Sequence, residues 1–430
     1  MPSPLSAGRS QKVALRGRSP AIPLATIPDV TFPQKAAQLL KTFSIRQFNP
    51  PSAPNPNIQT DKIEPPKAMN PIQKLPQFGQ SPWLDFIRRN YIKDGELQQM
   101  IDLGIRGVTS NPAIFEKAIA GSNDYDEAII SLTGAAKTPE EILDILSIED
   151  VAMAADLFRP IFDQTEGLDG YVSLEVSPHL ADDVQGTVAD GLRLWKELNR
   201  PNVMIKVPAT EAGVKAFREL TAAGVNVNVT LLFSTVRYQA IAEAYIEALE
   251  ERHAKGLPLH MASVASFFVS RVDTLLDPEL AEKSPELVGK IAIANSHMAY
   301  KIYEDLFKTD RFQKLVDAGA KPQRLLWAST SAKNPAYSPV LYVETLIGPD
   351  TVNTMPIETI DAYLEMGEPA DTLTGQYRIQ KSHMDAFAVA GFDIEATADT
   401  LQQQAIDKFV EPYEKLLTSL KKKQDSIYVG

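Results

Sequence analysis

From about residue 78 the chain alternates short apolar segments with longer amphipathic ones, and this alternation constrains the fold more than any other feature. Segments with the length and composition of buried strands lie at 81–86, 107–110, 171–177, 203–208, 225–232, 261–269, 324–329 and 351–355. Amphipathic segments between them predict helices, among them 94–104, 234–256 and 288–308. Strand and helix alternating eight times predicts an α/β fold, a (β/α)8 TIM barrel. The alternative, a doubly wound sheet, predicts a GxGxxG or GxxxxGK[ST] phosphate loop, and neither pattern occurs.

The two ends of the chain differ from this central part. Residues 1–75 hold ten Lys or Arg against three Asp or Glu, together with 13 of the 31 prolines, although the whole chain has a net charge of −12. A stretch poor in acids and rich in Arg, Ser and Pro resembles an organellar transit peptide. We therefore predict a disordered targeting segment and linker over 1–75, a plastid location with the cytoplasm as the alternative, and a catalytic domain over 76–430. The C-terminal segment 398–423 predicts a helix packed outside the barrel or over it.

Composition excludes several classes of site. There is no cysteine, so disulfides, thiol nucleophiles and thiolate metal ligands are all absent. The five histidines form no HxH or HExxH pair, which makes a zinc site unexpected. The negative net charge disfavours nucleic acid and anionic membranes as partners, and no apolar run reaches the roughly 18 residues of a membrane span.

The strand "NVMIKVPAT" (202–210) contains a lysine where a buried strand favours apolar residues. Burying an ammonium costs several kcal/mol, about 2 or more, unless it is paired or neutralised. Lys206 shares the parity of Met204, so it points into the barrel while Ile205 and Val207 face the surrounding helices. A desolvated lysine amine loses its proton more readily and then attacks carbonyl groups. The alternative is a structural salt bridge between Lys206 and a carboxylate.

Polar residues recur on the other strands and directly after them, where a barrel has its active site. In 225–232 the polar set Asn226, Asn228 and Thr230 alternates with valines and leucines, and we expect all three in the barrel mouth. The remaining polar residues of this kind are Asp85, Asn111, Glu175, Ser266, Arg271, Ser329 and Lys333.

Each of these residues taken alone has a structural explanation: a helix cap for Asp85, a turn before proline for Asn111, an ion pair for Glu175, a surface charge for Arg271. Their joint occurrence favours a site. Lys206 is the candidate nucleophile, with carboxylates to move protons, amides to bind hydroxyls and cations to hold a phosphate. Together they describe a class I aldol reaction on a phosphorylated sugar.

Five segments carry a specific resemblance: "GVTSNPAIFEKAIAGSNDYDE" (107–127), "MIKVPAT" (204–210), "NVNVTLLFS" (226–234), "WASTSAKNPAYS" (327–338) and "YVETLIGPDTVNTMP" (342–356). They strongly resemble the longer transaldolases of plants and bacteria, from about Ser81 to the C-terminus. The resemblance implies a class I aldolase-like barrel with additional C-terminal helices and no metal or organic cofactor. It also implies transfer of a dihydroxyacetone unit from a ketose phosphate to an aldose phosphate, in the non-oxidative pentose phosphate pathway.

Roles follow from the resemblance residue by residue. Lys206 matches the Schiff-base lysine, Asp85 the aspartate that takes the C4 hydroxyl proton, and Glu175 with Thr230 the pair that handles the water of imine formation. The substrate-binding positions matched are Asn111 and Asn228 for the dihydroxyacetone unit, and the sixth-strand serine, aromatic and phosphate-binding arginine, which are Ser266, Phe268 and Arg271. One position departs from the family. Shorter members have an arginine after the seventh strand, whereas this chain offers Lys333 at a shifted spacing, with Ser329 nearby. We expect Lys333 to bind phosphate as a point charge.

Two other functions stay open at this stage. The first is an aldolase of the same fold that releases free dihydroxyacetone to water, like fructose-6-phosphate aldolase. The second is a barrel without activity that serves as a binding protein, although the intact Asp85, Asn111, Glu175, Lys206 and Thr230 set argues against it. As partners we expect small-molecule sugar phosphates, with a homodimer as one candidate assembly.

Overall fold

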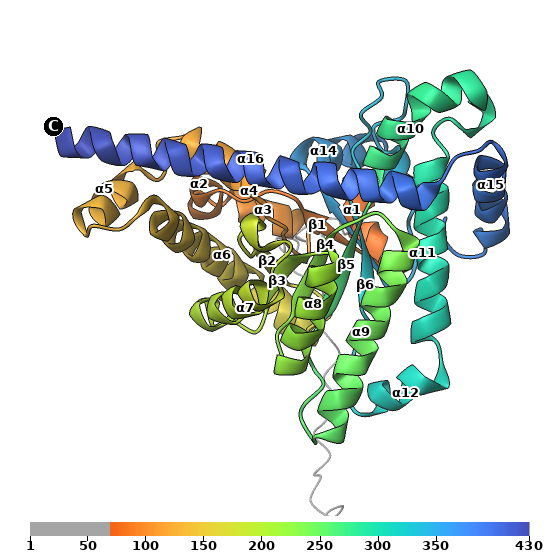
Figure 1. Ribbon diagram of the computed structural model, residues 1–430, viewed down its shortest axis with the longest axis horizontal. Coiled ribbons are helices and arrows are strands. Elements are labelled where there is room, and N and C mark those ends of the chain that lie inside the picture. The colour runs from red at the N-terminus through yellow and green to blue at the C-terminus, as the bar shows by residue number, and fades with distance from the viewer. Residues whose placement is uncertain (1–68, 430) are drawn as a thin grey trace, which may run out of the picture. The chain divides into compact units, whose positions relative to one another are not determined.

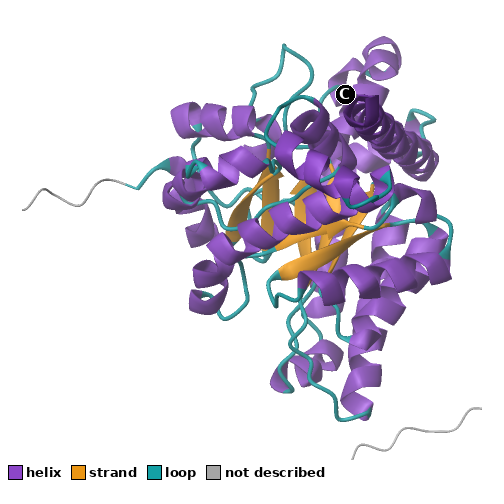
Figure 2. Cartoon of the chain, turned by 90° about the vertical axis from the view of Figure 1, so that its left-hand side faces the viewer, coloured by secondary structure: helices purple, strands orange, loops and turns teal. Residues whose placement is uncertain are grey.

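The structure, a computed structural model, describes residues 69–429, and its centre is a parallel sheet surrounded by helices (Figure 2). The strands are β1 (Gln80–Leu84), β2 (Val172–Glu175), β3 (Val203–Pro208), β4 (Val227–Leu232), β5 (Ser263–Phe268), β6 (Arg324–Ala328) and β7 (Thr351–Met355). Each overlaps one of the segments predicted from its apolar composition, and only β1 extends beyond its segment, by one residue at Gln80. Adjacent strands are parallel, in the order β1-β7-β6-β5-β4-β3-β2.

The predicted strand 107–110 is reduced to single bridges, yet it closes the sheet into a barrel. Val108 pairs with Leu84 of β1 on one side and with Val172 of β2 on the other. The Val108 amide donates to Tyr171 O at 2.9 Å, and the Thr109 amide donates to Leu84 O at 2.8 Å. The stretch is short because Asn111 already caps the next helix, whose first residue is Pro112. The eighth position of the barrel is therefore present, and the (β/α)8 prediction is confirmed.

Helices follow nearly every strand and cover the barrel (Figure 1). They are α1 (Pro71–Lys74), α2 (Arg89–Lys93), α3 (Glu96–Leu103), α4 (Pro112–Phe115), α5 (Asp126–Gly134), α6 (Pro139–Gln164), α7 (Val184–Leu198), α8 (Glu211–Ala223), α9 (Thr235–Ala254), α10 (Ser270–Lys283), α11 (Ile291–Phe307), α12 (Asp310–Asp317), α13 (Leu341–Glu344), α14 (Ile357–Met366), α15 (Tyr377–Val389) and α16 (Ile394–Val429). Short helical turns lie at η2 (Leu75–Phe78), η3 (Glu116–Ala120), η4 (Pro178–Leu180) and η5 (Pro285–Leu287). No helix within residues 69–429 is long and apolar enough to cross a membrane.

Local sequence signals set the helix that follows the lysine strand. β3 ends at Pro208, and Thr210 caps α8 by accepting a hydrogen bond from the Gly213 amide at 2.9 Å. The helix ends at Gly224, whose φ of +94° is a left-handed conformation that favours glycine. These signals hold the carboxyl end of β3 in a defined position.

An ion pair fills the barrel interior at the amino ends of the strands. Arg324 of β6 contacts Asp169 at 3.1 Å, and both side chains are almost fully buried. Ser81 of β1 links them, because its hydroxyl donates to Asp169 at 2.8 Å and accepts from Arg324 at 2.8 Å. Buried charges of this kind are stable only when each is hydrogen-bonded. The pair at this end of the barrel is therefore a satisfied structural one.

The folded domain begins earlier than the predicted boundary at residue 76. Asn70 caps α1 and donates through its side chain to Leu103 O at 3.0 Å. Ile72 and Leu75 are fully buried in the barrel's core. Residues 70–75 therefore belong to the barrel rather than to the leader, because their apolar side chains are needed to cover it. The rest of the predicted targeting segment, residues 1–68, lies outside the described residues.

Candidate active site

A cavity of 640 Å³ opens at the carboxyl ends of the strands, where barrel enzymes place their active sites. It is lined by nine of the eleven predicted site residues: Asp85, Asn111, Lys206, Thr230, Ser266, Phe268, Arg271, Ser329 and Lys333. They come from segments up to about 250 residues apart in the sequence. Most of the residues predicted from the strands and their ends therefore lie in one cavity.

Lys206 lies on β3 with only 4% of its surface exposed. Its Nζ donates one hydrogen bond, to Ser110 O at 2.9 Å. The Glu175 Oε2 atom lies 3.6 Å away, beyond hydrogen-bond length, on the neighbouring residue of β2 in the sheet register. An ammonium offers three donors, so this amine is held by fewer partners than it can use.

Glu175 is the carboxylate beside the amine, and its side chain is 7% exposed. Burial raises its pKa to about 6, and the charge of Lys206 opposes that rise. Its Oε2 has no hydrogen-bond partner among residues 69–429. Glu175 lines a second cavity of 450 Å³ between β2, α6, α7 and α16 rather than the cavity that holds Lys206. The carboxylate therefore lies beside the amine but lines a different cavity.

Asp85 follows β1 and supplies a second carboxylate to the cavity. Burial raises its pKa, while the hydrogen bond from Thr109 and the charges of Lys206 and Arg271 lower it. The Thr109 hydroxyl lies 2.7 Å from Asp85 Oδ1 and also 2.7 Å from the Thr354 hydroxyl of β7. A carboxylate with a raised pKa in a cavity is suited to accept and return a proton near neutral pH.

Thr230 and Asn228 lie on the inner face of β4, as predicted. Thr230 is buried, and its Oγ1 has no hydrogen-bond partner among the described residues. Asn228 sits beside Lys206 in the register, but it does not line the cavity. Its amide accepts from Ser266 at 2.7 Å and donates to Ser173 at 3.2 Å. Asn228 therefore reaches substrate only if these bonds rearrange, whereas Thr230 has a free hydroxyl.

Asn226 is a correction to the sequence prediction. It precedes β4, and its Nδ2 donates to Val203 O at 3.0 Å while its Oδ1 accepts from the Ala262 amide at 2.9 Å. It lies four residues before Thr230, about 13 Å along the strand. Parity alone placed it on the inner face, but its position along the strand puts it at the opposite end of the barrel, where it links strands.

Asn111 has both a structural position before Pro112 and a place in the cavity, the two alternatives that the sequence left open. Its Oδ1 accepts from the Ile114 amide at 3.0 Å as the cap of α4, and the residue also lines the cavity. Capping uses the amide oxygen and leaves the Nδ2 group as a donor for a ligand. The turn before Pro112 thus aims this amide at the cavity.

The far side of the cavity is cationic. Arg271, the second residue of α10, stacks over the Phe268 ring at 5.1 Å, and burial lowers its pKa. Among the described residues Arg271 forms no ion pair with a carboxylate, so its guanidinium is available. Lys333 is exposed and donates to Ser331 at 2.6 Å. Ser329 adopts a left-handed φ of +56°, and its hydroxyl lies 3.0 Å from that of Ser270.

Further cavity residues were not singled out from the sequence: Lys117, Thr354, Glu358, Lys408 and Phe409. Thr354 shows inward parity in "TVNTM", a signal that could have found it. Lys408 and Phe409 of α16 had no such signal, because the sequence of an amphipathic helix does not indicate which strand ends it packs against. No group of three or more metal-ligating side chains gathers anywhere in residues 69–429.

Comparison with known proteins decides the family. The family model "Transaldolase/Fructose-6-phosphate aldolase" matches residues 82–420. The chain belongs to this family. A transaldolase of Trichodesmium erythraeum is 44% identical over 370 residues, which cover 82% of this chain and 97% of the relative. A transaldolase of Saccharopolyspora erythraea is 44% identical over 359 residues, covering 82% and 98%.

Membership in the transaldolase family confirms the resemblance found in the sequence motifs, and with it the fold class and an enzymatic function of the transaldolase type. A third relative, a transaldolase 2 of a Nostoc species, is 44% identical over 375 residues and covers 83% of this chain and 98% of its own. Among solved structures, 2,3-dimethylmalate lyase is 12% identical with a TM-score of 0.25 and covers 76% of this chain and 97% of its own, a similarity too low to bear on the site.

Proposed function

We propose that this chain, an enzyme of the transaldolase type, transfers a dihydroxyacetone unit between sugar phosphates through a Schiff base on Lys206. The donor is a ketose phosphate such as sedoheptulose 7-phosphate or fructose 6-phosphate. The acceptor is an aldose phosphate such as glyceraldehyde 3-phosphate or erythrose 4-phosphate. The proposal places the reaction in the non-oxidative pentose phosphate pathway.

The observation that carries the proposal is the position of one amine. Lys206 is buried at the inner end of a 640 Å³ cavity, with a single hydrogen bond to a carbonyl and a carboxylate 3.6 Å away. A structural lysine would be expected to use all its donors, as buried polar groups do. A lysine whose donors are incompletely used can instead release its proton and attack a carbonyl carbon.

Imine formation needs proton transfers and the loss of one water. The Lys206 amine attacks the ketose C2 carbon, and the carbonyl oxygen becomes the hydroxyl of a carbinolamine. The Glu175 carboxylate takes the proton that Lys206 releases before the attack. A water held between the Thr230 hydroxyl and Glu175 relays this proton to the carbinolamine hydroxyl, which then leaves as water. Both groups have an unused hydrogen-bonding atom that is buried, and Glu175, with a pKa of about 6, exchanges protons near neutral pH.

Carbon–carbon cleavage then uses the second carboxylate. Asp85 takes the proton of the C4 hydroxyl, the C3–C4 bond breaks, and its electron pair flows into the iminium, leaving an enamine on Lys206. The C4 aldehyde leaves with its phosphate. An acceptor aldehyde reverses these steps, and Asp85 returns the proton. Arg271 and Lys333 hold the phosphate during both halves of the reaction.

Reductive trapping tests the proposal. Borohydride added with fructose 6-phosphate should reduce the imine and inactivate the enzyme. Peptide mass mapping should then place the adduct on Lys206. An adduct on another lysine, or the absence of any adduct, would contradict the proposed mechanism.

Release of free dihydroxyacetone is the second candidate activity, because the matching family model names an aldolase as well as a transaldolase. The two differ in the fate of the enamine. A transferase holds it until an acceptor arrives, whereas the aldolase protonates and hydrolyses it. We expect little dihydroxyacetone release without erythrose 4-phosphate and rapid transfer with it. Fast release without any acceptor would favour the aldolase.

We also propose a plastid location, on the basis of composition alone. Residues 1–75 combine a basic charge balance with a high content of proline and serine, which is typical of transit peptides. A fusion of these residues to a fluorescent reporter should enter plastids. A reporter that stays in the cytosol would contradict the location without affecting the enzymatic function.

The proposed partners are small-molecule sugar phosphates. The net charge of −12 disfavours binding to nucleic acid or to an anionic membrane. A homodimer is the candidate assembly, and light scattering after size-exclusion chromatography distinguishes it from a monomer.

A further inference from the structure

The C-terminal helix α16 reaches the active site. It runs as one long helix across the molecule, beside the ends of the strands (Figure 1). Two consecutive residues of this helix, Lys408 and Phe409, line the cavity that contains Lys206 and Arg271. The Lys206 amine lies 5.8 Å from the centre of the buried Phe409 ring. The helix therefore forms part of the wall opposite the strands.

Hydrogen bonds fix α16 over the strand ends. Gln402 donates to Ala209 O at 2.8 Å and to Leu231 O at 3.2 Å, just after β3 and within β4. Lys408 lies six residues further along, about 9 Å on a helix. Glu395 near the helix start accepts from Thr235 at 3.2 Å. These hydrogen bonds therefore fix the position of Lys408 relative to the strand ends.

The other half of the helix is held by ion pairs. Lys415 contacts Glu116 at 2.7 Å, and Lys423 contacts Asp126 at 2.6 Å. Lys421 pairs with Asp425 on the helix itself at 2.9 Å. Lys408, by contrast, has no carboxylate partner within 4 Å in the described part of the chain. It is the lysine of this helix that faces the cavity, and its charge is not neutralised there.

Lys408 also lies next to the cation expected to hold phosphate. It shares with Arg271 both the main cavity and a smaller groove of 140 Å³ between α10 and α16. A phosphate monoester has about two negative charges at neutral pH and several acceptor oxygens. The Arg271 guanidinium and the exposed Lys333 do not use all of these acceptor oxygens, so a further donor from α16 can bind the same phosphate.

We propose that Lys408 binds the substrate phosphate together with Arg271, so that the C-terminal helix contributes to specificity for phosphorylated sugars. This inference rests on the proposed function and adds a residue to it. Lys408 is a binding residue for the phosphate and takes no part in the Schiff-base chemistry. Its removal should therefore weaken binding of phosphorylated substrates and leave the reacting carbons unaffected.

The experiment compares two acceptors that differ only in the phosphate, glyceraldehyde 3-phosphate and glyceraldehyde. In a two-step transfer, kcat/KM for the acceptor reports the acceptor half-reaction alone. Lys408→Ala should lower kcat/KM for glyceraldehyde 3-phosphate about 10-fold or more, the value of a hydrogen bond to a charged group. The value for glyceraldehyde should change less than about twofold, as expected of a residue that does not touch the reacting atoms. Lys408→Arg should restore part of the loss.

Inorganic phosphate serves as an independent probe. Its inhibition constant against glyceraldehyde 3-phosphate should rise in Lys408→Ala and not in the control Lys421→Ala, which removes an exposed lysine of the same helix. Equal losses with both acceptors would overturn the proposal in favour of a packing role. Unchanged kinetics with both acceptors would overturn it in favour of Arg271 and Lys333 alone.

Trapping keeps this test separate from that of the proposed function. Borohydride reduction with saturating fructose 6-phosphate should still label Lys206 in Lys408→Ala. If wild type is not labelled at Lys206, the Schiff-base mechanism fails. If both proteins are labelled but the phosphate preference is unchanged, only the assignment of Lys408 fails. Thermal unfolding of both variants confirms that each is folded, and Lys408→Glu provides a second variant with a larger expected loss.

Discussion

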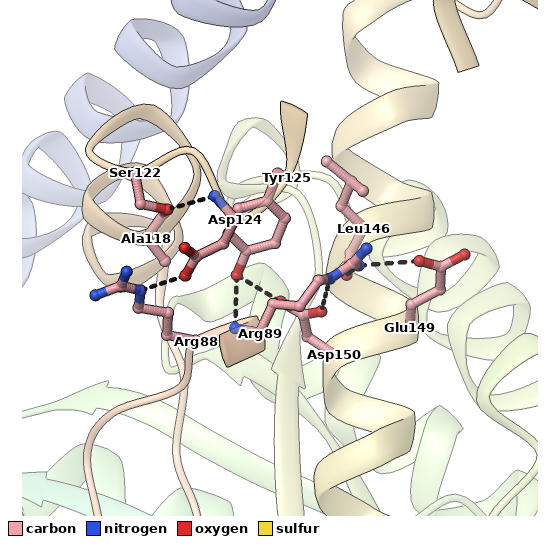
Figure 3. A network of polar contacts seen from close by, with 9 residues as sticks. All are labelled: Arg88, Arg89, Ala118, Ser122, Asp124, Tyr125, Leu146, Glu149 and Asp150. Atoms are coloured by element: carbon pink, nitrogen blue, oxygen red, sulfur yellow. Dashed lines mark hydrogen bonds and ion pairs between the residues drawn. The ribbon is translucent and has the colours of Figure 1, made fainter. Parts of the chain in front are cut away.

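Two buried cation–carboxylate pairs lie close to the carboxyl ends of the strands, and they differ in how fully their hydrogen bonds are satisfied. In the first, Arg89 of α2 bonds Asp150 of α6 at 2.7 Å and Glu149 at 2.9 Å (Figure 3). The other oxygen of Asp150 accepts from Tyr125 at 2.7 Å, and the same tyrosine hydroxyl accepts from the Arg89 amide at 3.0 Å. Every charged group in this network has close partners.

The second pair, Lys206 and Glu175, is loose by comparison. Its members are 3.6 Å apart, beyond hydrogen-bond length. The amine has one hydrogen bond, to Ser110 O, and the carboxylate oxygen that faces it has none among the described residues. The side chains of both pairs are at most 7% exposed, so burial does not account for the difference. Lys206 and Glu175 therefore have donors and acceptors that no described residue uses.

The extent of hydrogen bonding distinguishes a buried ion pair that stabilises the fold from one that is available for chemistry. A buried pair with all its hydrogen bonds made is costly to break and holds its elements in place. Here the Arg89 network ties the loop after β1, which carries Asp85, to α6 and to the segment before α5. A buried pair with unused bonds contributes little stability and is ready for chemistry.

The largest expected effect is the loss of activity when the lysine of the Lys206–Glu175 pair is replaced. Lys206→Met should lower transaldolase activity by on the order of 10⁴-fold or more, because the nucleophile of the covalent path is lost. Its stability should change by less than about 1.5 kcal/mol, since Met is similar in volume and Glu175 can become neutral. Steady-state rates and urea unfolding measure the two quantities. Unfolding of this variant would show that the pair is structural.

The next largest effect is the matched substitution in the other pair. Arg89→Met leaves Asp150 buried without its cation and should lower the free energy of unfolding by about 3–5 kcal/mol. Molecules that remain folded should still form the Schiff base at Lys206. Urea unfolding and borohydride trapping at low temperature test both statements. A stable but inactive Arg89→Met variant would contradict the structural role assigned to the Arg89–Asp150 pair.

A third substitution separates imine formation from turnover. Asp85→Ala should retain trapping at Lys206 but lose about 10²- to 10⁴-fold in turnover, the usual contribution of a general acid–base residue. Thr109→Val, which removes only the hydroxyl that bonds Asp85, serves as the milder control. Loss of trapping in Asp85→Ala would show that the aspartate acts before cleavage.

The smallest expected effect is a pH dependence due to Glu175. Burial raises its pKa to about 6, so the carboxylate form that accepts a proton is lost as the pH falls below that value. We expect kcat/KM to fall up to about tenfold per pH unit below pH 6 and this limb to be absent in Glu175→Gln. The same limb in Glu175→Gln would assign it to another group, such as Asp85.

Lowering the pH through this range reduces kcat/KM but should increase the contribution of Glu175 to the free energy of unfolding. Because the folded-state pKa of Glu175 lies above the ordinary value of 4.5, the native state binds the proton more tightly than the unfolded chain does. Glu175 therefore destabilises the fold above pH 6, and the cost disappears as the pH falls through that range to below 4.5. Urea unfolding of wild type and Glu175→Gln at pH 5 and pH 7.5 measures the difference.

Much of the barrel was predictable because its strands are buried on both faces and read as short apolar runs. Strands β3 and β7 begin and end where the sequence predicted, at Val203–Pro208 and Thr351–Met355. The strand at 107–110 was overpredicted, because Asn111 and Pro112 already start a helix. Asn226 was misplaced because parity states which face a residue is on, not how far along the strand it lies.

Sequence alone determined the family and singled out Lys206 as the candidate nucleophile, because alternation along a strand and specific motifs are local properties. Only the tertiary structure decided which carboxylate oxygen lies free beside Lys206, that Asn228 is engaged by two serines, and that α16 brings Lys408 and Phe409 to the cavity. These are contacts between segments far apart in the chain, up to about 320 residues. They depend on how helices pack against strand ends, and no periodicity within one segment contains that information.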